Sequence, residues 1–150
     1  MKKSKYQNKN ILVSFKYAFE GLLTALKTER NLRVDALAMI LVIIFGFIFK
    51  ISKLEWVICI VLSALVISAE VVNTVLETIV DMITEEINPK AKFAKDLAAA
   101  HVLIIALSSF VVGLFIFIPK IIDLFKYSII FLWNSIFLLD LDKLFIYVLL

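Results

Sequence analysis

Five polar residues stand out because their spacing places them on one face of a single helix: Glu70, Asn73, Thr74, Glu77 and Asp81. At 100° per residue, these side chains fall within about 100° of arc on an otherwise apolar segment. An ionisable group at bilayer depth costs roughly 3 kcal/mol or more, so this polar stripe indicates a function. The structural alternative is that the stripe holds neighbouring helices together through hydrogen bonds or ion pairs.

Depth along this helix separates the roles of the carboxylates. Counted from Trp56, Glu70 lies about 21 Å along the helix and Glu77 about 31 Å. Glu77 is therefore expected at headgroup level, while the deeper Glu70 suits a general base acting on a lipid. Carboxylates such as Glu29 and Glu77 can hold Mg²⁺ together with substrate phosphates. Lys95 can neutralise phosphate charge, although a lysine at the start of a helix often only extends its amine to the membrane surface.

The sequence contains no glycine-rich phosphate-binding loop. The three glycines, Gly21, Gly46 and Gly113, are isolated, which excludes a Walker motif and the glycine-rich loop of protein kinases. Any nucleotide must therefore be held by side chains and metal. Cys59 and His101 are single residues of their types, so the chain cannot form an internal disulfide or a metal site built from cysteines or histidines.

The amino-acid composition indicates that the chain is a membrane protein. Hydrophobic residues make up 63% of the chain and charged residues 19%, and the mean hydropathy is +1.02. A soluble domain is nearer half apolar and a quarter charged. The apolar runs are continuous rather than alternating, which favours membrane-spanning helices over a closed barrel.

Hydrophobic periodicity predicts an all-α membrane protein with an amphipathic interfacial helix and three transmembrane helices. The interfacial helix is expected within residues 11–33, where apolar residues recur on one face. The three spans are expected at residues 34–49, 54–84 and 97–118. Pro119 and Lys120 close the third span. Residues 127–139 leave two interpretations open, a short fourth hydrophobic helix that spans the membrane or an interfacial hairpin.

The distribution of basic residues predicts how the chain is oriented. Basic residues gather at the amino-terminal end and in the stretch 85–96: Lys2, Lys3, Lys5, Lys9, Lys16, Lys27, Arg30, Arg33, Lys90, Lys92 and Lys95. Loops rich in lysine and arginine face the cytoplasm. We therefore expect a multi-pass protein of the cell membrane whose polar stripe opens toward the cytoplasm.

Several stretches resemble the prokaryotic diacylglycerol kinase and undecaprenol kinase family. They are Thr28-Glu29-Arg30-Asn31, the run from Glu70 to Asp81, Asn88-Pro89, Ala94-Lys95-Asp96 and Pro119-Lys120. The resemblance covers roughly residues 14–121. It implies a surface helix and three transmembrane helices per subunit, a homotrimer, and active sites shared between neighbouring subunits at the cytoplasmic face.

The resemblance also implies roles for individual residues. Glu70 matches the catalytic base, which also contacts the lipid substrate, and Glu29 and Glu77 match the Mg²⁺ ligands. The expected ATP-binding residues are Tyr17, Glu29, Asn73, Glu77, Lys95 and Asp96. Ala100-His101 departs from the family's usual Gly-Ala pair, and we expect a packing or hydrogen-bonding role for His101.

The expected reaction is transfer of the ATP γ-phosphate to a membrane lipid hydroxyl. The residues of these motifs resemble those of undecaprenol kinases from Gram-positive bacteria, so undecaprenol is the expected acceptor. Diacylglycerol is the alternative acceptor. An alternative of another class is a small proton-coupled transporter that uses Glu70. Residues 1–121 are expected to form the kinase domain, and residues 122–150 a hydrophobic extension of open role.

Overall fold

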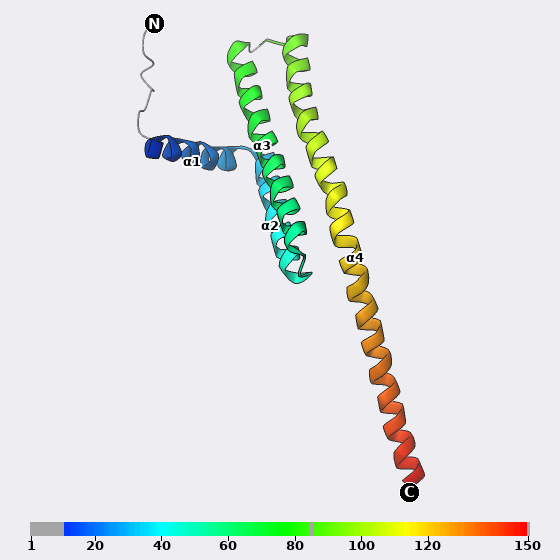
Figure 1. Ribbon diagram of the computed structural model, residues 1–150. Helices are drawn as coiled ribbons and strands as arrows, with labels where there is room; N and C mark the ends of the chain where they lie inside the picture. The colour runs from blue at the N-terminus through cyan, green and yellow to red at the C-terminus, as the bar shows by residue number, and fades with distance from the viewer. Residues whose placement is uncertain (1–10, 85, 150) are drawn as a thin grey trace.

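The computed structural model describes residues 11–84 and 86–149, with side chains as far as Trp133. It contains four helices: α1 (Ile11–Thr28), α2 (Arg30–Ile48), α3 (Lys53–Ile83) and α4 (Pro89–Leu149). Figure 1 shows α2 beside α3, α4 running along α3, and α1 lying crosswise to the other three. The described part of the chain has no strand, and α2, α3 and part of α4 are long and apolar enough to cross a membrane. The predicted all-α membrane fold is confirmed.

A sharp corner joins α1 to α2. Glu29 has extended backbone angles (φ −89°, ψ 122°), which end one helix and begin the next. Arg33 fixes the corner because its Nη1 donates to the carbonyl oxygen of Lys27 at 2.8 Å, satisfying a free group at the end of α1. As a result, α2 begins at Arg30, four residues before the predicted first span.

The turn between α2 and α3 is closed by a capping box. The Ser52 backbone N–H donates to Glu55 Oε2 at 2.6 Å, and the Glu55 N–H donates to Ser52 Oγ at 3.3 Å. Lys50 adopts a φ of 50°, which turns the chain within a few residues. This cap sets the start of α3 and hence the register of the polar stripe.

Gly46 allows α2 and α3 to approach closely at this end. A Cβ on Gly46 would lie 2.7 Å from Cη2 of Trp56, closer than real carbon atoms come. The indole of Trp56 also packs on Phe47, with ring centroids 5.0 Å apart. The Trp56 indole therefore occupies the space that a side chain at position 46 would need.

Gly46→Ala is expected to destabilise the fold by about 1–2 kcal/mol, because overpacking costs 1–3 kcal/mol and alanine returns part of this as helix propensity. The midpoint of SDS-induced unfolding in mixed micelles measures the change. Gly113→Ala is the matched control, since a Cβ there meets no described atom within 4 Å. Equal midpoints for the two variants would contradict the close approach at Gly46.

The packed core lies at the same end of the bundle. Buried Ile51, Cys59 and Ile116 form its centre. The Phe117 ring packs edge-on against Phe49 at a centroid distance of 6.1 Å. Lys120 Nζ lies 3.4 Å from Glu55 Oε1, so an ion pair ties α4 to the first turn of α3.

The bounds of α4 differ from the predicted third span. The helix begins at Pro89 rather than Leu97, because Asn88 Oδ1 accepts from the Lys90 N–H at 2.9 Å and proline suits a first helical position. It then continues through Pro119 to Leu149. Residues 127–139 are thus a continuation of α4, neither a separate fourth helix nor a hairpin.

Candidate active site

Glu70 lies at the centre of the candidate site. Glu70 is only 4% exposed. It lies on the face of α3 that meets the α1–α2 corner. The side chain of Asn31 hydrogen-bonds to its carboxyl group, and Asp35, Glu77 and Glu29 interact with it electrostatically. The corner between α1 and α2 therefore brings residues from two further segments to the polar stripe.

Asn73 is the second buried member of the stripe, with 5% exposure. Its Nδ2 donates to Glu77 Oε1 at 3.1 Å, one helical turn away. Its Oδ1 is buried and has no hydrogen-bond partner among the described residues. Because buried polar atoms are normally paired, this acceptor can take a donor or a cation from outside the described residues.

Glu29 is positioned by the corner itself. Its backbone N–H donates to the Ala25 carbonyl at 2.7 Å, and its Oε1 accepts from Thr28 Oγ1 at 3.1 Å. The half-buried side chain thus extends from the only non-helical residue between α1 and α2. This placement explains how a residue far from the stripe in sequence comes to interact with Glu70.

The donor set suits a hard cation. Three carboxylates, those of Glu29, Asp35 and Glu77, each interact with that of Glu70, and none of the four joins an ion pair within the described residues. Within the described residues, no three acidic, histidine or cysteine side chains lie close enough together to coordinate a metal ion by themselves. Mg²⁺ commonly takes one or two carboxylates and obtains its other ligands from phosphates and water, so the residues fit it.

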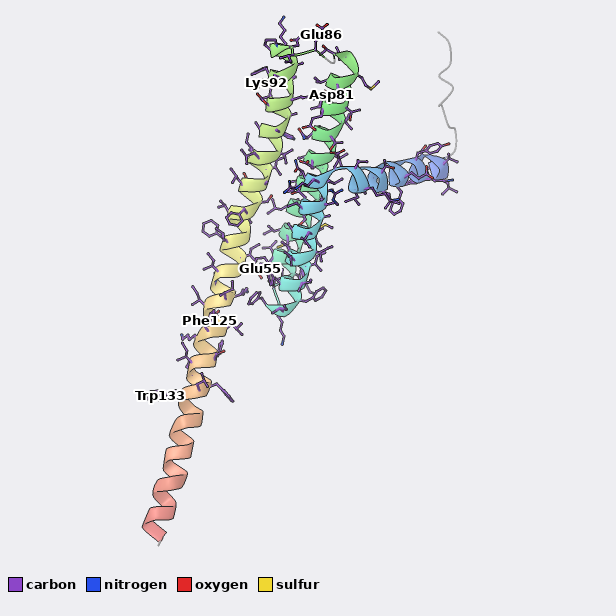
Figure 2. The ribbon with its side chains drawn as sticks, turned by 180° about the vertical axis from the view of Figure 1, so that it is seen from behind. Glu55, Asp81, Glu86, Lys92, Phe125 and Trp133 are labelled. Carbon is purple, nitrogen blue, oxygen red and sulfur yellow. The ribbon has the colours of Figure 1, made fainter. Side chains whose placement is uncertain are left out.

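Lys95 and Asp96 lie in the second turn of α4. Lys95 forms an ion pair with Asp81 of α3, and Lys92 Nζ lies 2.6 Å from Asp96 Oδ2. Figure 2 shows Asp81 and Lys92 near the ends of α3 and α4 that are joined by the short loop. No described contact links either Lys95 or Asp96 to Glu70. Lys95 thus meets the stripe at exposed Asp81 rather than at its buried end.

Tyr17 is separate from the stripe within this chain. It lies in the middle of α1 with 56% of its surface exposed. No described hydrogen bond or ring contact joins it to α3. Its predicted role in ATP binding thus has no support from contacts inside one chain.

Two cavities lie between the helices, and one of them adjoins the stripe. A cavity of about 310 Å³ between α3 and α4 is lined by Asn73, His101 and apolar side chains. A larger cavity of about 570 Å³ lies among α2, α3 and α4, and its lining is apolar apart from a few groups that include Asp35 and Ser109. Asp35 therefore belongs both to the wall of the larger cavity and to the carboxylates that interact with Glu70.

Sequence reasoning assigned no role to Asp35 and none to Asn31 beyond its place in a motif. Asp35 carried a signal, since an acidic residue at the start of an apolar span is itself a functional indication. The position of Asn31 in the sequence did not indicate a function, because an asparagine near the start of a helix is usually a cap. Only the corner at Glu29 reveals that both residues face Glu70.

Comparison with known proteins identifies the family of this chain. Residues 16–117 match the family described as prokaryotic diacylglycerol kinase. The chain is 42% identical over 108 residues to the undecaprenol kinase of Bacillus subtilis, covering 72% of this chain and 88% of that protein. It is 34% identical over 116 residues to a diacylglycerol kinase of Synechocystis sp., covering 77% and 66% respectively. A diacylglycerol kinase of Haemophilus influenzae is 32% identical over 95 residues, covering 63% and 80%. The chain belongs to the prokaryotic diacylglycerol kinase family.

Proposed function

We propose that this protein is an ATP-dependent lipid kinase whose acceptor is undecaprenol and whose product is undecaprenyl phosphate. The observation that carries the proposal is the buried Glu70 carboxylate, which interacts with three other carboxylates and the Asn31 amide, while one of those carboxylates, that of Asp35, also lines an apolar cavity. The acceptor follows from the similarity to an undecaprenol kinase. Diacylglycerol is the second candidate, because two other relatives are diacylglycerol kinases.

In the proposed mechanism Glu70 acts on the acceptor hydroxyl. The carboxylate accepts the hydroxyl proton while the lipid oxygen forms a bond to the γ-phosphorus of ATP. The bond from that phosphorus to the β,γ-bridging oxygen breaks, and ADP leaves. Asn31 holds the Glu70 carboxyl group in place, and the larger cavity takes the start of the hydrocarbon tail.

Glu29 and Glu77 are the proposed Mg²⁺ ligands. Both interact with Glu70, and Asn73 orients Glu77 through its amide nitrogen. The metal, when bound, would neutralise charge on the transferring phosphates. Without a cation, four neighbouring carboxylates would repel an ATP polyanion.

Lys95, Asp96, Asn73 and Tyr17 are the proposed additional ATP contacts. Lys95 would leave Asp81 and bind a phosphate of ATP instead. Its ion pair with Asp81 is solvent-exposed, and exposed pairs contribute only about 0–1 kcal/mol to stability. The distance of Tyr17 from the stripe is consistent with a homotrimer in which a neighbouring subunit supplies this residue. The family resemblance is the basis for that oligomer.

The proposed site faces the cytoplasm, where ATP is found. The amino-terminal end and the loop before α4 carry most basic residues, as expected for cytoplasmic segments. The proposed kinase domain covers residues 1–121, and the family match ends at residue 117. The transporter alternative gains no support from these relatives, and it leaves Lys95 and Asp96 unexplained.

Acceptor competition tests the proposed substrate. Purified protein in mixed micelles is given γ-labelled ATP with undecaprenol, with diacylglycerol, or with both at equal mole fraction. We expect kcat/KM for undecaprenol to exceed that for diacylglycerol at least about tenfold, equal to 1.4 kcal/mol of transition-state binding. Preferential labelling of diacylglycerol would contradict the proposed acceptor and leave the kinase assignment standing. Protein carrying Glu70→Gln serves as the background control.

A further inference from the structure

The carboxy-terminal half of α4 extends far beyond the helical bundle. The Lys120–Glu55 ion pair ties α4 to the first turn of α3, at the end remote from Asp81. From Lys120 to Leu149 the helix continues for about 44 Å at 1.5 Å per residue. Figures 1 and 2 show this part of α4 running past the ends of α2 and α3. A helix of 61 residues is about 90 Å long, three times the thickness of a bilayer's hydrocarbon core.

The first part of this extension, residues 121–133, has a wide apolar face and a narrower polar one. At 100° per residue, Asp123, Lys126 and Tyr127 fall within about 100° of arc, and Leu124, Phe125 and Leu132 lie on the opposite side. The five consecutive residues Ile129, Ile130, Phe131, Leu132 and Trp133 turn through more than a full helical turn and are 47–72% exposed. A partner helix covers a single stripe, so it would leave the other faces in water. The lipid interface covers the whole of a wide apolar face and leaves the polar face among the headgroups.

The residues just after the ion pair have the composition of a membrane interface. Asp123 and Lys126 interrupt the apolar run, and Tyr127 and Trp133 are of the type that concentrates at headgroup level. The hydroxyl of Ser128 is satisfied inside the helix, because its Oγ donates to the Leu124 carbonyl at 3.0 Å. Ser128 therefore needs no polar partner outside the helix.

Pro119 supplies a place for the helix to bend. Proline has no backbone N–H and its ring crowds the carbonyl four residues earlier, so interior prolines kink helices. Pro119 lies one residue before Lys120 and therefore where α4 leaves the bundle. A bend here redirects the protruding part without disturbing α3 or the polar stripe.

We propose that α4 bends at Pro119 in the bilayer and that residues 121–133 form a second membrane-binding helix. This helix lies in the lipid interface at the Glu55–Lys120 end, on the membrane surface opposite the Glu70 site. Lys126 faces lipid phosphates, and Trp133 sits among the headgroups and upper acyl chains. The kinase would thus bind the lipid interface on both surfaces, with α1 on one and this segment on the other. The proposal concerns residues outside the family match and does not depend on the reaction.

Depth-dependent fluorescence quenching tests the proposal in the full chain. Trp56→Phe leaves Trp133 as the only tryptophan, and the protein is reconstituted into vesicles with lipids brominated near the carbonyl or near the methyl end. Because an interfacial helix buries its apolar side about 5–10 Å deep, we expect the shallow bromines to quench most of the Trp133 emission and the deep ones less. Trp133→Phe is the control, since the remaining Trp56 packs on Gly46 and Phe47.

Three results would overturn the proposal. Quenching by aqueous acrylamide but by neither bromolipid would mean that the segment projects into water. Protection from both quenchers would mean that protein, such as a second copy, covers it. Stronger quenching by the deep bromines would mean that the segment spans the bilayer.

A second measurement covers the case in which Trp56→Phe disturbs the Gly46 contact. Trp133→Cys, with Trp56 retained, is labelled with a nitroxide, and the parent protein controls for labelling of buried Cys59. Collisions with oxygen should exceed collisions with a water-soluble nickel complex. The reverse ratio would also overturn the proposal.

Discussion

Glu70→Gln is expected to lower the rate of phosphoryl transfer by about 10²–10⁴-fold, the usual contribution of a general base. Glutamine has the size of glutamate and its amide oxygen can still accept from Asn31, so packing around this buried residue should persist. The amide cannot take the hydroxyl proton at neutral pH. The loss should therefore appear in kcat, while ATP binding remains largely intact because the proposed metal ligands are unchanged.

Rapid-quench measurement of a single turnover, combined with equilibrium binding of an ATP analogue, separates these two effects. Glu55→Gln is the matched control. It changes another glutamate of α3 at the opposite end, where glutamine can still complete the capping box with Ser52. A Glu70→Gln protein that retains half of the wild-type rate would exclude Glu70 as the base.

Alanine substitution of Glu29 and of Glu77 is expected to weaken Mg²⁺-dependent nucleotide binding in each case, with strong non-additivity in the double variant. Residues that serve one ion act as a unit, so the second substitution removes little that the first has left. Contacting residues typically show interaction energies of about 0.5–3 kcal/mol in such cycles. The two carboxylates come from different segments and both interact with Glu70, so their coupling is a property of the folded corner.

The measurement is a double-mutant cycle on the dissociation constant of ATP at several Mg²⁺ concentrations. Asp81→Ala is the control, because Asp81 belongs to the same stripe but pairs with Lys95. Its cycle with Glu29→Ala should be nearly additive. Additive losses for the pair of Glu29 and Glu77 would place the two carboxylates in separate sites.

The sequence alone predicted much of α3. A helix without glycine or proline fixes the angular position of each residue, so the shared face of Glu70, Asn73 and Glu77 follows from spacing. The structure adds that Glu70 and Asn73 are both buried. Burial could be anticipated for Glu70 because hydrocarbon depth increases with distance from the helix ends.

Other features depend on contacts between segments and could not be read from periodicity. The corner at Glu29 places Asn31 and Asp35 against Glu70, and a hydrophobic pattern does not encode the direction of such a turn. The ion pair of Lys95 with Asp81 depends on the register of α4 against α3. The continuation of α4 through Pro119 opposes the local signal, since proline more often marks a helix end.

The central claim is that this chain phosphorylates a lipid hydroxyl with Glu70 as the base. The most direct measurement incubates purified wild-type and Glu70→Gln protein with γ-labelled ATP, Mg²⁺ and undecaprenol, and identifies the labelled products by chromatography and mass. We predict that the wild type places the label in undecaprenyl phosphate and that the variant does so at the background rate. Label released only as inorganic phosphate, or equal lipid labelling by both proteins, would contradict the account.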